Sequence, residues 1–270
     1  MRAVRCCDVK AGSLRAGLSY ALRAVAGSAD ERRLSRYALL LKLVRAFGFD
    51  LHSPHNIWRH DQEFLPVWQA YPETHDYFHE RYYHLYHVAL AASSVPGDTA
   101  ECGCFRGAGS YMIMKATQAE HARVTGRIHH IFDSFEGLSE PDAQDIQSET
   151  GRSSWRKHDL SAQEHVVRRN LKGAGDFRCH KGWIPERFGD VADRNFALVH
   201  IDVDLYQPTR DSLAFFYPRM NPGGFIVCDD YGSVRCPGAR RACDEFMADK
   251  PEKIIRLTSG QSLIVRLPRG

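Results

Sequence analysis

The sequence contains no C-x-x-C pair, although it has eight cysteines. Cysteines at that spacing are typical of zinc ribbons and thioredoxin-type redox sites, so neither kind of site is expected. Several cysteines, such as Cys102 and Cys228, fall inside apolar runs, where a reduced thiol behaves as a small hydrophobic side chain. This usage indicates a reducing compartment, and we expect a cytoplasmic protein.

Long apolar runs and a strong excess of one charge are also missing. No apolar run approaches the roughly 18–20 residues that a transmembrane helix needs, and the basic N-terminal stretch lacks the apolar region of a signal peptide. The chain has 36 Lys and Arg residues and 33 Asp and Glu residues, so its net charge is only +3. This excess is too small to indicate a nucleic-acid partner. We therefore expect neither a membrane nor a nucleic acid as partner.

The first third of the chain reads as helical. With 43% hydrophobic and 26% charged residues, the composition is that of an ordinary globular protein. Apolar residues recur at helical spacing from Leu14 to Phe49, and again over residues 74–94. The mixed, Pro- and His-rich stretch over 48–72 is interpreted as a loop. We expect residues 1–95 to form a helical cap and residues 96–270 to form the core domain.

After Pro96 the pattern changes to short apolar runs that alternate with helical stretches. The predicted strands cover residues 98–103, 127–132, 176–180, 196–202, 224–229, 253–257 and 262–266. The predicted helices cover residues 109–120, 161–172, 184–188, 207–217 and 237–248. Strands joined by helical crossovers indicate a parallel, doubly wound α/β sheet, and the short link Leu257–Gln261 makes the last two strands an antiparallel hairpin. This is the layout of Rossmann-like methyltransferases, in which ligands bind at the carboxyl ends of the strands.

A glycine-rich turn after one strand and an acidic residue at the end of the next strand together predict a nucleoside-binding site. The stretch from Glu101 to Ser110 ends a strand and opens a helix, and its glycines allow a tight turn and a close approach of the backbone to a ligand. Asp133 ends the next strand, where an acidic residue can accept hydrogen bonds from ribose hydroxyls. The alternatives are a plain strand–helix turn and a helix cap at Asp133.

Carboxylates end two further strands. Asp202 and Asp204 follow one strand, and Asp229 and Asp230 follow the next. Asp202, Asp229 and Asp230 are expected to converge, and clustered carboxylates need a cation or a proton to offset their repulsion. Oxygen ligands select Mg²⁺, Mn²⁺ or Ca²⁺. The alternative is that these acids cap helices or pair with arginines, namely Arg210, Arg240 and Arg241.

The polar segment over 137–161 is long for a connection in a compact domain, and such segments are often lids or binding loops. Trp155 stands alone among polar neighbours. We interpret the segment as a lid in which the Trp155 ring packs over another group, the alternative being a solvated insertion.

The order and spacing of several segments resemble the macrocin O-methyltransferase family, of the TylF type. The segments that match are PGDTAECGCFRGAGS, DSFEGLSEPD, KGWIPERF, IDVDLYQPTRDSL, YPRMNPGGFIVCDDYG and PGARRACDEF. The resemblance implies a class I, S-adenosylmethionine-dependent enzyme that methylates hydroxyl groups, such as those on deoxysugars of antibiotics. It covers most of the chain from about residue 70 onwards, and residues 1–60 match poorly.

The resemblance also implies roles for individual residues. Glu101, Gly103 and Gly107 would line the methionine and ribose, Asp133 and Ser134 would hold the ribose or adenosine, and Gly182 and Trp183 would flank the adenine. Cys104 and Phe105 stand where the family usually has a small or β-branched residue and Trp. The full set assigned to the cofactor is Thr74, Glu101, Gly103, Cys104, Phe105, Gly107, Asp133, Ser134, Ser161, Gly182 and Trp183. Asp202, Asp229 and Asp230 would hold Mg²⁺ or Mn²⁺, with Asp202 also placed to act as the base.

We therefore expect a metal-assisted O-methyltransferase of a small-molecule hydroxyl, with a sugar moiety as the favoured acceptor. On family grounds, residues 1–95 would serve substrate and subunit contacts in a homo-oligomer. Two alternatives remain open. Asp202-Val203-Asp204 is a D-x-D sequence, which binds a metal–nucleotide-sugar in glycosyltransferases. The chain could also be a non-catalytic interaction module on the same fold.

Overall fold

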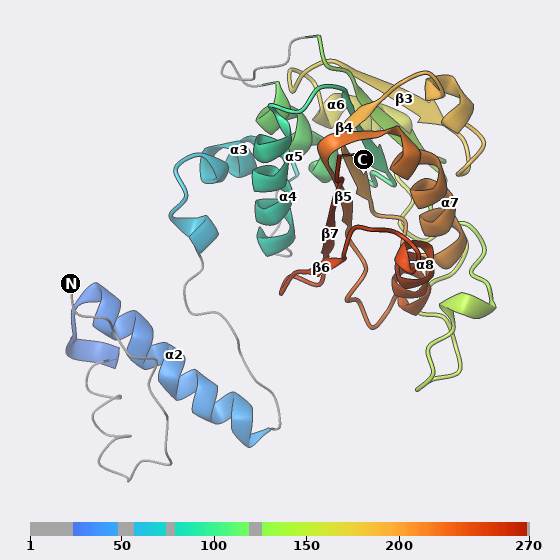
Figure 1. The fold of residues 1–270 in the computed structure, drawn as a ribbon. Coiled ribbons are helices and arrows are strands. Elements are labelled where there is room, and N and C mark those ends of the chain that lie inside the picture. Colours follow the sequence, from blue (N-terminus) through green and yellow to red (C-terminus); the bar gives the residue numbers. More distant parts are fainter. Residues whose placement is uncertain (1–23, 48–56, 74–78, 119–125, 269–270) are drawn as a thin grey trace. The chain divides into compact units, whose positions relative to one another are not determined.

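The computed structural model describes residues 24–47, 57–73, 79–118 and 126–268, and the chain divides into two compact units, residues 1–60 and 61–270. In the first unit, helix α2 (Ala29–Ala46) and the short 3-10 helix η1 (Ile57–Arg59) are described (Figure 1). A reciprocal cap precedes α2. The Ser28 N–H donates to Glu31 Oε2 at 2.9 Å, and the Glu31 N–H donates to Ser28 Oγ at 3.3 Å. Such a pairing satisfies two backbone donors that a helix start leaves open.

The second unit is built on a seven-stranded sheet with the order β3-β2-β1-β4-β5-β7-β6. The strands are β1 (Asp98–Cys102), β2 (His129–Asp133), β3 (Phe177–Lys181), β4 (Phe196–Ile201), β5 (Met220–Cys228), β6 (Ile255–Arg256) and β7 (Ser262–Val265). β1 to β5 pair in parallel, whereas β7 is antiparallel to both β5 and β6. The predicted doubly wound sheet with a closing hairpin at one edge is confirmed.

Helices cover both faces of this sheet (Figure 1). They are α3 (Phe64–Ala70), α4 (His79–Ala92), α5 (Ala108–Thr117), α6 (Glu164–Asn170), α7 (Tyr206–Phe216) and α8 (Pro237–Met247). α4 packs on α5, which contacts β1 and β2, while α7 packs on α8 and contacts β4. Within the described ranges, no helix is both long enough and apolar enough to cross a membrane.

Two predictions about local structure are wrong. Residues 48–72 were expected to be a loop, but α3 forms within that stretch. Asp61 Oδ1 accepts hydrogen bonds from the N–H groups of Glu63 and Phe64 and stabilises its start. Buried Phe64 and Trp68 then hold the helix on α4 through stacked and edge-on aromatic rings, including a Trp68–Tyr82 pair with centroids 4.9 Å apart.

The helix predicted over 184–188 is likewise absent, and a 3-10 helix, η3 (Phe188–Val191), begins only where it should end. Pro185 lacks an N–H donor and disfavours a helical backbone at the residue before it. Isolated turns form instead, closed by hydrogen bonds from the Glu186 N–H to Trp183 O and from the Phe188 N–H to Pro185 O.

Strand register brings the candidate site together. Cys102 of β1 lies opposite Ile201 of β4, which in turn lies opposite Cys228 of β5. The residues that follow these three, Gly103, Asp202 and Asp229, therefore leave the sheet at the same level. β1 and β4 are buried along their whole length, and the strand order reverses direction between them. A doubly wound sheet opens its ligand crevice at that switch point.

A buried ionic network closes the opposite, amino end of the strands. Asp98 Oδ2 lies 3.1 Å from His130 Nε2 and 2.7 Å from Arg194 Nη2, and Asp98 Oδ1 accepts a hydrogen bond from the Ile128 N–H. Although burial alone would raise it, these contacts lower the pKa of Asp98 to about 2. The ionised carboxylate thus ties β1 to the start of β2 and to the residues that lead into β4.

We predict that Asp98→Asn lowers the free energy of unfolding by about 2 kcal/mol at pH 7. The pKa of Asp98 is lower in the folded state than in the unfolded state, where it is near 4. The ionised carboxylate therefore stabilises the fold above about pH 4, and this stabilisation is lost as the pH falls towards 2. Urea unfolding at pH 7 and near pH 2.5 measures both effects, so the difference between the variant and the parent should shrink in acid. Asp176→Asn, at an exposed position, is the control and should change neither value.

Candidate active site

A cavity lies at the carboxyl ends of β1, β2 and β4. Of the residues that the sequence assigned to a ligand or metal, those that line it are Gly103, Phe105, Asp133, Ser134, Trp183 and Asp202. Residues of the predicted nucleoside-binding site and one member of the acid cluster therefore line the same cavity. Gly103 has φ +77, and a Cβ there would lie 2.0 Å from the Asp202 carbonyl oxygen. Only glycine allows the β1 turn to pass so close to the end of β4.

Asp133 holds the shape of this cavity. Its Oδ2 accepts a hydrogen bond of 2.7 Å from the Cys104 N–H, and its Oδ1 accepts one of 2.7 Å from the Phe135 N–H. The carboxylate thus fixes the turn after β1 and the turn after its own strand at the same time. Each oxygen keeps a second lone pair that can accept from a ligand hydroxyl.

The other residues assigned to the cofactor lie around the cavity and not in its lining. Glu101 is buried and contacts His200 and Ser110, Gly107 precedes α5 and faces Val167 and Leu171, and Cys104 is buried. The Gly182 N–H donates to Asp133 O at 3.1 Å, and Ser161 is exposed. Thr74 lies outside the described residues. Their roles toward a cofactor stay predictions.

Left-handed backbone conformations gather in the cavity wall. Phe105, Leu160 and Asp204 all line the cavity and have φ of 45, 59 and 58. This conformation is uncommon for residues other than glycine and costs most for bulky ones. Such strain clusters at ligand-binding sites, and Phe105 is also 44% exposed there. Sequence patterns did not single out Leu160, and they assigned Asp204 only to the alternative D-x-D motif.

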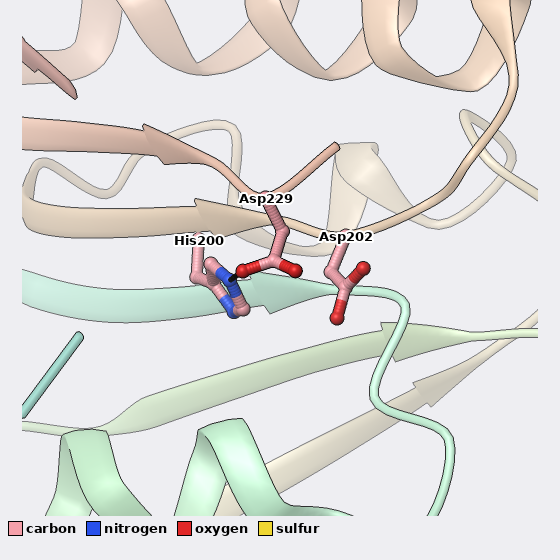
Figure 2. Close-up of side chains that lie close together, drawn as sticks. All are labelled: His200, Asp202 and Asp229. Carbon is pink, nitrogen blue, oxygen red and sulfur yellow. Dashed lines mark hydrogen bonds and ion pairs between the residues drawn. The ribbon is translucent and has the colours of Figure 1, made fainter. Parts of the chain in front are cut away.

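The predicted acid cluster forms where β4 and β5 end (Figure 2). Ligand atoms of His200, Asp202 and Asp229 all lie within 4.8 Å of one another, and the same holds for Asp204, Asp230 and Cys236. The trio Asp202, Asp229 and Asp230 is therefore distributed over two adjacent groups. Oxygen is the donor atom of every member except His200 and Cys236.

His200 is engaged at both ring nitrogens. Nδ1 lies 2.8 Å from Glu101 Oε1, and Nε2 lies 3.2 Å from Asp229 Oδ1. Burial opposes a charge on the ring, but hydrogen bonds to these two carboxylates raise the pKa of His200 well above its usual value. A protonated imidazole has no lone pair for a metal. His200 therefore acts as a buried cation that orients Asp229.

The remaining acids repel one another. Burial and the neighbouring charges of Asp229 and Asp230 raise the pKa of Asp202 well above its usual value, and burial and Asp229 raise that of Asp230. Asp229 is the exception. Despite burial, His200 and Arg81 lower its pKa. The cluster thus holds more carboxylates than His200 and Arg81 can balance.

Arg81 of α4 is the arginine that pairs with this cluster, and the sequence did not indicate it. Its guanidinium contacts Asp229 Oδ2 through Nη1 and lies 3.7 Å from Asp230 Oδ1 through Nη2. The three arginines named as alternative partners make other contacts. Arg210 donates to the Tyr206 hydroxyl at 3.5 Å, Arg240 pairs with Asp244 at 3.6 Å, and Arg241 donates to Gln144.

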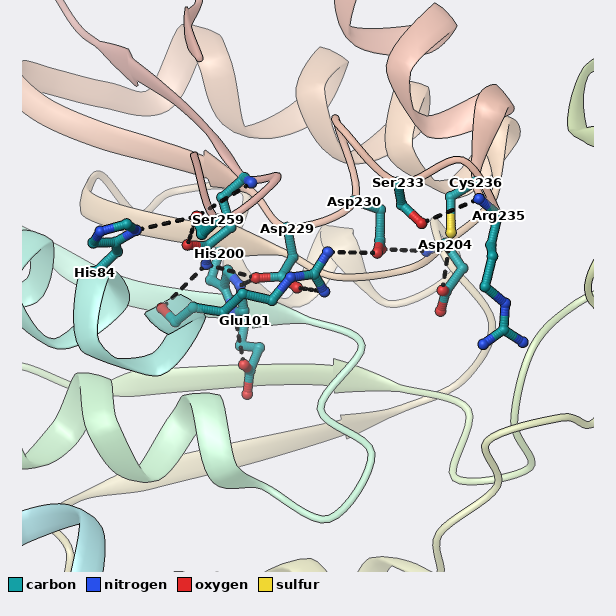
Figure 3. Close-up of polar contacts among 12 residues, drawn as sticks. His84, Glu101, His200, Asp204, Asp229, Asp230, Ser233, Arg235, Cys236 and Ser259 are labelled. Atoms are coloured by element: carbon teal, nitrogen blue, oxygen red, sulfur yellow. Dashed lines mark hydrogen bonds and ion pairs between the residues drawn. The ribbon is translucent and has the colours of Figure 1, made fainter. Parts of the chain in front are cut away.

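The segment over 137–161 supplies part of the wall. Gly137, Leu138, Ser139 and Leu160 line the cavity. Trp155 packs below the Arg235 guanidinium, 4.2 Å from the ring centroid, and its Nε1 donates to Cys236 Sγ at 3.3 Å. Cys236 Sγ lies 3.4 Å from Asp204 Oδ1 (Figure 3). The Trp155 ring thus packs against another group, as expected, while the interpretation of the segment as a lid stays a prediction.

Comparisons with known proteins agree with this geometry. A family model described as macrocin O-methyltransferase (TylF) matches residues 80–256. The chain is 33% identical over 156 residues to the 8-demethyl-8-(2,3-dimethoxy-alpha-L-rhamnosyl)-tetracenomycin-C 4'-O-methyltransferase of Streptomyces olivaceus, covering 56% of this chain and 59% of that protein. It is 30% identical over 164 residues to the demethyldecarbamoylnovobiocin O-methyltransferase of Streptomyces niveus, covering 59% and 61%. The matches thus span about three fifths of these two relatives.

Among solved structures, the O-methyltransferase NovP is similar with a TM-score of 0.54 and 27% identity, covering 68% of this chain and 80% of that one. This likeness and the strand order confirm the Rossmann-like, class I methyltransferase fold.

We predict that Asp133→Asn weakens binding of S-adenosylhomocysteine about tenfold or more. The amide that replaces one oxygen would point its NH₂ at the N–H of Cys104 or Phe135 and lose a hydrogen bond to a charged acceptor. Isothermal titration calorimetry measures the affinity, with Asp176→Asn as the charge-matched control. An unchanged dissociation constant would show that Asp133 shapes the turns without contributing to the ligand site.

Proposed function

Because the family model covers residues 80–256, the chain belongs to the macrocin O-methyltransferase family, and we propose that it methylates a hydroxyl group on a sugar moiety of a natural product. The observation that supports this best is the position of Asp202. Asp202 lines the cavity that contains Asp133 and Trp183, and its carboxylate also belongs to the acid cluster. A methyl donor and an ionising hydroxyl can therefore meet at one residue.

Asp133, Trp183 and Gly103 are the residues that we propose for S-adenosylmethionine. Asp133 has free lone pairs for ribose hydroxyls, the Trp183 ring offers a face for the adenine, and Gly103 brings the backbone of the β1 turn into the cavity wall. Bound S-adenosylmethionine would supply a methyl group on a sulfonium centre. Phe105 and Leu160 would exclude water from that centre, because both are apolar and line the same cavity.

The acid cluster fits a divalent cation. Asp202, Asp229 and Asp230 offer hard oxygen donors, which suit Mg²⁺ or Mn²⁺. The raised pKa values of Asp202 and Asp230 reflect uncompensated negative charge, which a cation would neutralise. A cation held by these three residues would act as a Lewis acid and lower the pKa of an acceptor hydroxyl.

We assign the proton acceptor to Asp202, with Asp204 as the competing candidate. Both residues line the cavity. Asp202 is also a proposed metal ligand, and a bound cation would reduce its basicity. Asp204 stands beside the proposed metal ligand Asp230, which accepts a hydrogen bond of 3.3 Å from the Asp204 N–H. Burial and Asp230 raise the pKa of Asp204 well above its usual value.

The relatives guide the proposed acceptor. Their names describe O-methylation of a rhamnosyl-tetracenomycin and of demethyldecarbamoylnovobiocin, so we propose a glycosylated natural product as the substrate. Residues 1–95 are proposed to contribute to acceptor binding and to subunit contacts in a homo-oligomer. The family match gives no support to the glycosyltransferase alternative for Asp202-Val203-Asp204.

Calorimetric titration with S-adenosylhomocysteine, with and without Mg²⁺, tests the cofactor class. We expect micromolar affinity, because the cavity offers a ribose acceptor, an aromatic ring and an apolar wall together. Absence of binding under both conditions would remove the methyltransferase proposal. UDP-glucose, titrated without Mg²⁺, probes the glycosyltransferase alternative and should show no saturable binding.

We predict that Asp202→Asn weakens Mg²⁺ binding at least tenfold and reduces turnover at least a hundredfold, since it removes a ligand and the proposed base. Asp204→Asn should keep Mg²⁺ affinity within about twofold. Magnesium affinity is measured calorimetrically, and turnover as S-adenosylhomocysteine release with any glycosylated acceptor that the parent methylates. A hundredfold loss of turnover in Asp204→Asn at saturating Mg²⁺ would move the role of base to Asp204.

A further inference from the structure

The contact between Arg81 and the acid cluster joins segments that are far apart in the chain. Arg81 projects from α4, and its partners follow β5 at positions 229 and 230. The guanidinium reaches both carboxylates, one with each terminal nitrogen. Its side chain is 20% exposed, whereas those of Asp229 and Asp230 are 7% exposed. A cation from one face of the sheet thus covers two acids that are otherwise buried.

Only one oxygen of Asp229 is open to such a partner. Oδ1 accepts a hydrogen bond of 2.7 Å from Gln261 Nε2 and lies 3.2 Å from His200 Nε2. Oδ2 is the oxygen that Arg81 contacts. Because Oδ1 already has two donors, a divalent cation held by Asp229 must bind at Oδ2. The guanidinium and the cation therefore require the same atom.

Helix α4 is anchored without this ion pair. Gln261 Nε2 also lies 3.3 Å from the Arg81 carbonyl oxygen. His84 Nδ1 lies 3.1 Å from Ser259 Oγ, and Ser259 Oγ donates to Gln261 Oε1 at 2.9 Å (Figure 3). The turn between β6 and β7 thus holds the helix backbone in place. The Arg81 side chain can leave Asp229 while the helix stays docked.

We propose that Arg81 is a built-in counter-cation of the acid cluster, which stabilises the metal-free protein and is displaced from Asp229 when a divalent cation binds. This proposal rests on the proposed metal-assisted function. Arginine suits the role because it stays charged at any physiological pH and its planar fork spans two carboxylates. Competition of this kind sets the metal affinity below what the three carboxylates alone would give.

The test compares Mg²⁺ affinity, measured by calorimetry, in the parent and in three variants. We expect Arg81→Gln to bind Mg²⁺ about tenfold more tightly, because a hydrogen bond to a charged group no longer has to be broken. Arg81→Lys keeps the charge and should stay close to the parent. Arg235→Gln removes the same charge from the neighbouring loop, where the guanidinium lies over Trp155, and should change the affinity less than twofold.

Thermal unfolding gives a second measurement that needs no substrate. In the presence of a chelator, Arg81→Gln should melt below the parent, because the carboxylates lose their counter-charge. Saturating Mg²⁺ should remove most of this difference. Arg235→Gln should show no such dependence on the cation.

An affinity of Arg81→Gln for Mg²⁺ equal to or weaker than that of the parent would overturn the proposal, since Arg81 would then only position Asp229. Absence of Mg²⁺ binding in both proteins would overturn it as well. S-adenosylhomocysteine titrated into the same samples separates this result from the proposed function. Failure of the parent to bind S-adenosylhomocysteine counts against the methyltransferase proposal, whereas the Mg²⁺ comparison still decides the role of Arg81.

Discussion

The buried imidazole of His200, held between Glu101 and Asp229, is the interaction on which the rest of the site depends. Its partners come from β1 and from the end of β5, so one side chain of β4 links three strands at their carboxyl ends. Ser110 of α5 and Gln261 complete the shells of the two carboxylates. A buried polar network is tolerable only when its members are satisfied. Here that requirement fixes Asp229 through Oδ1 and leaves Oδ2 to Arg81.

The two ends of the sheet use buried charge in opposite ways. At the amino end, Asp98 meets His130 and Arg194, and its pKa falls to about 2. At the carboxyl end, burial and mutual repulsion raise the pKa values of Asp202 and Asp230. The first arrangement stabilises the fold, whereas the second costs stability that a counter-cation or a proton must offset. Such a cost is typical of sites retained for function.

The sheet and the acid cluster could be predicted because both follow from short-range patterns. Strands that alternate with helices predict a parallel sheet, and the register of such a sheet brings strand ends such as Asp202 and Asp229 together. Arg81 could not be predicted, because its contact with Asp229 joins residues 148 positions apart. The start of α3 depends on hydrogen bonds to Asp61, and the chain near Pro185 depends on hydrogen bonds within isolated turns. Average secondary-structure propensities of the residues do not predict either set of hydrogen bonds.

The segment over 137–161 contacts both the cavity and the acid cluster. Leu138 and Leu160 line the cavity near Asp133, while Trp155 reaches Asp204 through Cys236. The Phe105 and Asp204 backbones on either side of the cavity are left-handed, and strain of this kind persists only where the surrounding contacts enforce it. The Trp155–Cys236–Asp204 chain is one such contact. Through this contact, and through the hydrogen bond from the Asp204 N–H to Asp230 Oδ2, the segment is linked to the acid cluster as well as to the cavity wall.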